Sequence, residues 1–270
     1  MMRTLRNAAL LALVLLAAAG YVRPVAGETA ERLLSEPLPD VLASVIAPQP
    51  APEPAEPIVP AELADALARR GLTAEDLPGS QLVLVTPDGN EAAVTCYRRD
   101  SAGWAAVEGL TAIPGHVGRN GVNDDRRMGD GTTPTGLYDL GLAFGKEPRP
   151  DTEMPWRDIT EQSYWTGDDT ELLWYNRWVE RDQVPADADI DWRGSEHLVD
   201  HKSYTYCVLI EFNTGADKSS ERGFAIFFHS DIGTPTQGCV SIPEAQMKAV
   251  IEWLKPDAAP QILIDRPAGA

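Results

Sequence analysis

From Gln81 onward the chain consists of short segments rich in β-branched and aromatic residues, separated by turn residues. Such segments are typical of β-strands, and they contain no strand-helix-strand repeat. The first two flank the turn residues 87–90 and predict a hairpin. Large apolar side chains alternate along residues 204–212, and residues 223–228 are apolar throughout, as in a strand covered on both faces. We therefore predict a mainly β domain with a few helices, of the α+β class.

Two segments predict helices. In residues 61–71 Leu63 and Leu67 are four apart, and Gly71 is suited to end the helix. In residues 241–256 an apolar stripe recurs with helical spacing at Met247, Val250, Ile251 and Leu254.

The start of the second helix carries a capping signal. Ser241 and Glu244 have the S-x-x-E spacing of a capping box, and Pro243 falls between them. We therefore predict Ser241 as the N-cap, with Pro243 inside the first turn.

The first 60 residues are not expected to join the folded domain. Residues 1–26 combine arginines, an apolar stretch and small residues near Ala26, the pattern of a secretory signal peptide. The apolar stretch, about a dozen residues, is shorter than the roughly 20 that span a bilayer. Residues 27–60 are rich in Pro, Ala and Glu and predict an extended linker. A short helical segment (61–79) and the folded domain (80–267) would follow.

Export would place the protein outside the cytoplasm, in the cell wall or a periplasmic-type space, with no integral membrane domain after signal cleavage. The formal net charge is −18, and it becomes −21 when Arg3, Arg6 and Arg23 leave with residues 1–26. Such a surface repels nucleic acid and anionic lipid, so neither is expected as a partner. The sequence carries no information on the oligomeric state.

The three cysteines have different settings. Cys96 and Cys207 lie in strand-type segments, where they can pair in an oxidising compartment or remain buried thiols. Cys239 follows Gly238 in a turn, two residues before the predicted N-cap. The positive end of a helix favours a thiolate, so Cys239 is the candidate nucleophile.

His229 is the candidate base for Cys239. It ends the apolar segment 223–228, and a short loop of turn-forming residues leads from it to Cys239. Gly238 permits backbone angles closed to other residues, so the N–H groups of Gly238 and Cys239 can converge on an oxyanion. The residues alone leave two alternatives, a Cys-His site or a strand-end histidine beside a packed cysteine.

Other motifs point away from metals and nucleotides. His197 and His201 are four apart, but the H-E-x-x-H pattern of a zinc site is absent, and residues 129–136 lack the lysine of a P-loop. The acidic segment 121–131 does not have EF-hand spacing and is expected to be a mobile loop. We predict no metal and no cofactor.

Residues 154–178 are rich in tryptophan and tyrosine. They can form an aromatic wall over a peptide groove, with Trp174 and Tyr175 in contact with substrate, or they can pack a long insertion. The sequence leaves both alternatives open.

The segments "FFHS" and "TQGCVSIP" resemble the motif of the L,D-transpeptidase catalytic domain (YkuD-like) family, in which a His-Ser pair precedes a Ser/Thr-x-Gly-Cys turn. The likeness extends to "VGRNG" (117–121), "GDGTTPTGLYDLGLAFG" (129–145) and "YNRWV", and so spans about residues 81–267. It implies a β-sandwich-like mixed sheet.

The resemblance also implies residue roles. Cys239 would be the nucleophile and His229 its base, while the Ser230 carbonyl would orient the histidine ring. Gly238 and Cys239 would donate to the oxyanion. Gln237 and Ser241 occupy substrate-contacting positions, where better-known members carry histidine and arginine or asparagine.

The implied substrate is a peptidoglycan stem tetrapeptide. The thiolate would attack the carbonyl of the third, L-centred residue, expel the terminal D-alanine and form a thioester. An amine of a neighbouring stem would resolve it to a 3-3 crosslink, or water would do so in an L,D-carboxypeptidase. A non-catalytic wall-binding module is the alternative from a different class.

Overall fold

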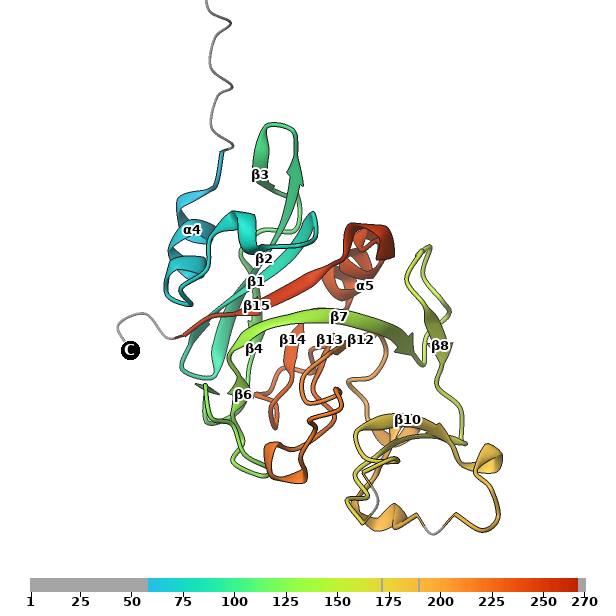
Figure 1. Ribbon diagram of the computed structural model, residues 1–270. Helices are drawn as coiled ribbons and strands as arrows, with labels where there is room; N and C mark the ends of the chain where they lie inside the picture. Colours follow the sequence, from blue (N-terminus) through green and yellow to red (C-terminus); the bar gives the residue numbers. More distant parts are fainter. Residues whose placement is uncertain (1–57, 171, 189, 267–270) are drawn as a thin grey trace, which may run out of the picture. The chain divides into compact units, whose positions relative to one another are not determined.

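The computed structural model describes residues 58–170, 172–188 and 190–266 (Figure 1). The predicted signal peptide and nearly all of the predicted linker lie outside these residues. Within them, two α-helices, α4 (Ala61–Ala68) and α5 (Glu244–Trp253), accompany strands β1 to β15. The prediction of a mainly β protein of the α+β class is confirmed. No helix in the described ranges has the length and apolar character needed to cross a membrane.

One mixed sheet of ten strands dominates the fold (Figure 1). Its strands, in spatial order, are β1 (Gln81–Asp88), β15 (Gln261–Ile264), β7 (Gly136–Gly145), β12 (Cys207–Ile210), β13 (Phe227–Ser230), β14 (Val240–Ile242), β4 (Ile113–His116), β2 (Glu91–Asp100) and β3 (Gly103–Ala106), with β8 (Trp156–Asp158) paired to β7. Because β1 also pairs with β2 in the predicted hairpin, the sheet closes into a barrel-like sandwich.

Smaller elements surround this sheet. One further sheet contains β9 (Ser163–Thr166), β10 (Arg177–Glu180) and β11 (Glu196–His197), and another contains β5 (Val122–Asn123) and β6 (Thr133–Pro134). Short 3-10 turns are η1 (Ala74–Asp76), η2 (Arg181–Gln183), η3 (Trp192–Gly194), η4 (Leu198–Asp200), η5 (Ser220–Arg222) and η6 (Pro256–Ala258).

The alternation of side chains along each strand distributes the apolar residues among three cores. In β1, Val83 and Val85 face the barrel interior, whereas Leu82 and Leu84 belong to the cluster that α4 covers. The predicted apolar stripe of α5 closes the interior, since Met247, Val250, Ile251 and Leu254 are fully buried there. In β13, Phe228 faces the interior and Phe227 faces a second cluster outside it. Strand β13 is therefore covered on both faces as predicted, but it begins only at Phe227, so most of the apolar segment 223–228 precedes it.

The outer cluster is largely aromatic. Trp165, Tyr175 and Trp178 pack with Phe144 and Phe227 in it. The tryptophan-rich insertion thus covers the outer face of β7, β12 and β13, which is the packing alternative of the two that the sequence left open.

The capping-box prediction is wrong. Helix α5 has Pro243 as its N-cap, with φ −53° and ψ 143°, and no side chain caps it. Ser241 lies instead inside β14, paired with His229 of β13 and His116 of β4. Its hydroxyl donates to Asp231 Oδ1, 3.2 Å away, because the strand ladder directs it there.

The cysteines are free thiols. Cys96 is buried in the barrel interior and Cys207 in the outer cluster, on opposite faces of the sheet. This separation excludes the disulfide that the sequence left open.

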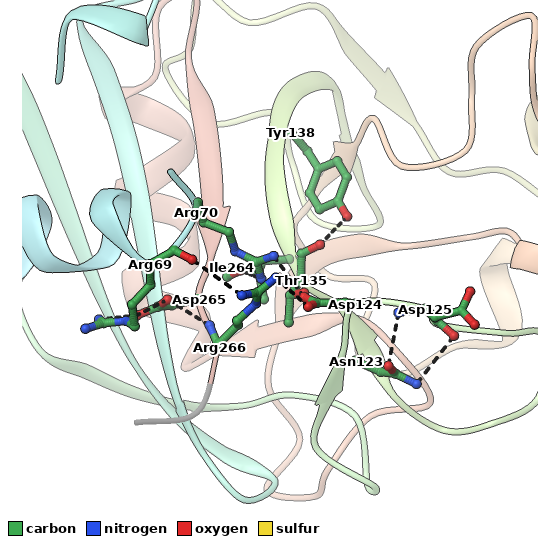
Figure 2. Close-up of polar contacts among 10 residues, drawn as sticks. All are labelled: Arg69, Arg70, Asn123, Asp124, Asp125, Thr135, Tyr138, Ile264, Asp265 and Arg266. Carbon is green, nitrogen blue, oxygen red and sulfur yellow. Dashed lines mark hydrogen bonds and ion pairs between the residues drawn. The ribbon is translucent and has the colours of Figure 1, made fainter. Parts of the chain in front are cut away.

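A polar cluster joins distant parts of the chain (Figure 2). Arg70, just after α4, and Arg266, just after β15, both form ion pairs with Asp124, at 2.8 and 2.7 Å. Arg69 Nε donates to Asp265 at 3.0 Å. Asp124, in the segment 121–131 that the sequence predicted to be a mobile loop, is thus anchored by two arginines.

Candidate active site

Strand register brings His229 and Cys239 to one face of the sheet. Strands β13 and β14 are parallel neighbours, and Phe228 is opposite Val240, both facing the barrel interior. Because side chains alternate, Phe227, His229 and Cys239 all project from the other face. Both His229 and Cys239 line a cavity of about 350 Å³ on that side.

Cys239 is held as a neutral thiol. Its side chain is 8% exposed, and Sγ lies 3.4 Å from both the Phe227 N–H and the Ala225 carbonyl oxygen, to which it donates. Burial raises the pKa of the thiol to about 12, and the Glu196 carboxylate adds to the increase, while the Phe227 N–H and Arg126 oppose it. Helix α5 begins five residues after Cys239, so the prediction of a thiolate stabilised by its N-terminus is wrong.

His229 is oriented by its own strand. Its Nδ1 lies 2.8 Å from the Ser230 carbonyl oxygen, which only accepts, so Nδ1 carries the proton and Nε2 is the free base. The Tyr204 ring packs edge-on against the imidazole, with 5.5 Å between ring centres. Burial lowers the pKa of His229 to about 4. Cysteine and histidine are therefore both neutral near pH 7, and the thiol must turn from Ala225 to reach the imidazole.

Two threonines hold the Gly-Cys turn. Gly238 has φ 152°, a conformation that favours glycine. Its N–H donates to Thr236 Oγ1 at 3.1 Å, and the same hydroxyl donates to the Cys239 carbonyl at 2.7 Å. Thr133 Oγ1 donates to that carbonyl as well, at 3.1 Å. One of the two expected oxyanion donors, the Gly238 N–H, is thus engaged within the turn.

The residues predicted to contact substrate divide into two groups. Gln237 lines the cavity, and its Oε1 accepts from Arg119. Ser241 is fully buried against Asp231 and does not line it.

Trp174 and Tyr175 also lie outside the cavity lining. The Trp174 ring lies under Arg177, and Tyr175 packs behind Phe224, with 5.8 Å between ring centres. Since Phe224 itself lines the cavity, Tyr175 supports the wall rather than forming it.

No sequence pattern singled out Arg126. It lies in the segment expected to be mobile, yet it is 6% exposed and lines the cavity. Nε donates to the Thr132 carbonyl at 3.0 Å, and Nη1 donates to the Arg222 carbonyl. Its position just before the "GDGTTPTG" segment was the one available signal.

Glu196, His201 and Tyr204 also line the cavity. Tyr204 Oη donates to Glu196 Oε2 at 2.7 Å, and His201 Nε2 lies 3.8 Å from the same oxygen. The His201 ring stacks on Tyr204, at 4.6 Å between centres. Through the ring of Tyr204 this group contacts the imidazole of His229.

His197 and His201 do not share a helix. They lie at β11 and directly after η4. Within the part of the chain that the structure describes, no group of three or more His, Cys, Asp or Glu residues is placed to hold a metal ion.

The fold and the cavity define a mainly β protein in which a buried cysteine and a histidine, on adjacent parallel strands, face one pocket. The sequence model of the YkuD family, the L,D-transpeptidase catalytic domain, matches residues 106–263, more than half of the chain. The protein belongs to this family.

Among solved structures, the chain is similar to the helical cell shape determining protein Pgp2 from Campylobacter jejuni, with 12% identity and a TM-score of 0.36. A point mutant of the same protein matches with 12% identity and a TM-score of 0.34. Each match covers 70% of this chain and 48% of the other, so the chain spans about half the length of that protein. No curated protein matches it.

Proposed function

We propose that this protein is an exported cysteine acyltransferase that cleaves the bond before the terminal D-alanine of a stem tetrapeptide and transfers the acyl group to an amine of a neighbouring stem. The observation that carries this proposal is the common face of His229 and Cys239 on adjacent strands, with one cavity in front of both. The stem peptide is the expected partner, and cell-wall biogenesis and cell shape are the processes served.

The neutral state of both groups determines how the reaction begins. Because burial disfavours both the thiolate and the imidazolium, we expect proton transfer to accompany attack rather than precede it. Nε2 of His229 takes the proton as Sγ of Cys239 bonds to the carbonyl carbon. The same proton then passes to the amine of D-alanine as the bond to it breaks. D-alanine departs, and the acyl group remains on Cys239 as a thioester.

In the second half, an acceptor amine attacks the thioester carbon and loses its proton to His229. The thiol is regained when that proton returns to Sγ. Exchange of one amide for another needs no ATP. Water as the acceptor would give an L,D-carboxypeptidase, the second candidate.

The test is D-alanine release from a stem tetrapeptide, with and without an acceptor amine. Cys239→Ala is expected to lower the release rate by at least about 1,000-fold, as the loss of a covalent nucleophile does. Cys96→Ala is the matched control, since this buried thiol lies in the barrel interior and should leave the rate near that of the parent.

The products separate the candidates. A crosslinked dimer supports transfer, whereas tripeptide alone in the presence of excess amine supports hydrolysis. Release by Cys239→Ala at the parent rate would refute the nucleophile assignment, and binding without any release would leave the non-catalytic module.

A further inference from the structure

We propose that Arg126 binds the C-terminal carboxylate of the peptide that Cys239 attacks, and that this residue selects the free carboxyl end next to the scissile bond. The inference rests on the proposed function and adds the residue that selects the leaving group. It assigns a role to a buried charge in the cavity that acyl transfer by Cys239 and His229 does not use.

The guanidinium of Arg126 is fixed beside the Gly-Cys turn. Nε and Nη1 are used by the carbonyls of Thr132 and Arg222. Nη2 is the remaining nitrogen, and it stands 3.0 Å from where a Cβ on Gly238 would be. In the described residues Nη2 has no hydrogen-bond partner, so a donor remains at the cavity next to Cys239.

The charge of Arg126 lacks an ionic partner. Both of its bonds go to neutral carbonyls. Asp130 is the carboxylate that acts on Arg126 through space, but among the described residues no ion pair joins the two. A buried and unpaired cation is costly, and such a group is retained where a ligand supplies the counter-charge. The buried thiol of Cys239 does not supply it, because its pKa near 12 keeps the sulfur neutral.

The other charges of the cavity give the peptide a direction. Glu196 is held on the Tyr204 side, where the ring of Tyr204 contacts His229. Arg126 contacts the Gly238 side of the turn. Asp231 also lines the cavity, and it acts on His229. Burial raises the pKa of Glu196 and so weakens its repulsion of a carboxylate. The attraction of Arg126 therefore directs the leaving residue toward Arg126.

The geometry suits a terminal carboxylate. In a peptide that ends one residue after the attacked carbonyl, the carboxylate lies only a few bonds from the carbon that Sγ reaches. Arg126 is adjacent to the turn that carries Sγ, and a guanidinium forms short, charge-assisted bonds to a carboxylate. A longer peptide would place an uncharged amide there and leave the guanidinium unpaired.

The test measures binding, on Cys239→Ala protein so that no turnover intervenes. Calorimetry compares a stem tetrapeptide with the same peptide carrying a C-terminal amide. We expect the free acid to bind at least about 30-fold more tightly, the lower end of what loss of one partner of a buried charge pair causes. Adding Arg126→Met should remove the preference by lowering the affinity for the free acid alone. Arg126→Lys should retain part of the preference.

Arg127→Met is the matched control. Arg127 is the next residue, its side chain is 61% exposed and it pairs with Asp125 on the surface, so its loss should leave the preference intact. If Arg126→Met fails to fold, the affinities for the acid and the amide in the parent and in Arg126→Lys still test the inference.

Two results would overturn the inference alone. One is equal affinity for the acid and the amide in protein with Arg126 intact. The other is an equal loss of affinity for both peptides in Arg126→Met, which would indicate a role at the oxyanion or in folding. Failure to bind either peptide would instead refute the substrate class of the proposed function, and the inference with it.

Discussion

A Cβ on Gly238 would stand 3.0 Å from Arg126 Nη2, Ile226 Cδ1 and the Thr132 carbonyl oxygen. The residue also has φ 152°, so both space and backbone conformation require glycine. This close packing fixes the residue that precedes Cys239. The direction of the Cys239 carbonyl is set in turn by the hydroxyls of Thr133 and Thr236. At the scale of single residues, the site depends on the backbone of the turn as much as on the thiol.

Gly238→Ala is expected to lower the free energy of unfolding by about 1–3 kcal/mol, because it adds backbone strain and a contact with Arg126. Denaturant unfolding measures the change. Gly233→Ala is the matched control in the same loop, since Gly233 has φ 80° but nothing within 4 Å of its Cβ position. A loss no larger than that of Gly233→Ala would show that the turn yields to the methyl group.

At the scale of elements, the pair β13 and β14 carries the site, and α5 holds it from within. The two strands are parallel and are joined by a loop without a helix, so residues 229 and 239 stay close in space. Helix α5 follows β14 and packs its apolar stripe into the barrel interior, against the inner side of β13. The inner face is thus filled by apolar side chains, while His229 and Cys239 face the cavity on the outer side.

Ile251→Ala is expected to lower the free energy of unfolding by about 2–4 kcal/mol, because Ile251 is fully buried in the barrel interior. Thermal or urea unfolding measures the change. Glu252→Ala, the next residue, removes only a surface pair with Lys248 and should change stability by less than about 1 kcal/mol. Similar losses for the two variants would contradict the assignment of the core face of α5.

At the scale of the whole described unit, Asp124 connects the two ends of the fold to the segment that carries Arg126. It pairs with Arg70 after α4 and with Arg266 after β15 (Figure 2). The hydroxyl of Thr135, and then these two arginines, lower the pKa of Asp124 to about 2. The N-terminal helix and the last strand thereby stabilise the wall of a cavity far away in sequence.

The depressed pKa of Asp124 predicts an acid-dependent loss of stability. The unfolded carboxyl has a pKa of about 3.9, so the contribution of Asp124 is complete above pH 4 or so and disappears as the pH falls through about 2. The free energy of unfolding, measured with urea across this window, should fall less steeply with decreasing pH for Asp124→Asn than for the parent. Asp88→Asn, at the exposed hairpin turn, serves as the control and should keep the parent slope. Identical slopes for parent and Asp124→Asn would contradict the network.

The sequence by itself determined the mainly β class, the hairpin, the apolar face of α5 and the family. These follow from local periodicity, turn chemistry and a short motif, which depend on neighbours in the chain. The start of α5 was misjudged because Ser241 satisfies its backbone in a ladder with β13 and β4, partners that no local pattern shows.

Only the tertiary structure decided what surrounds the thiol. Burial against Phe227 makes Cys239 neutral, whereas the position of a helix end had suggested a thiolate. The fold also brings Arg126 and Glu196, 70 residues apart in sequence, to one cavity. Strand pairing joins distant segments, and no local sequence pattern shows which segments will meet. Desolvation and long-range charge depend on packing, so the chemistry of the cavity became visible only in three dimensions.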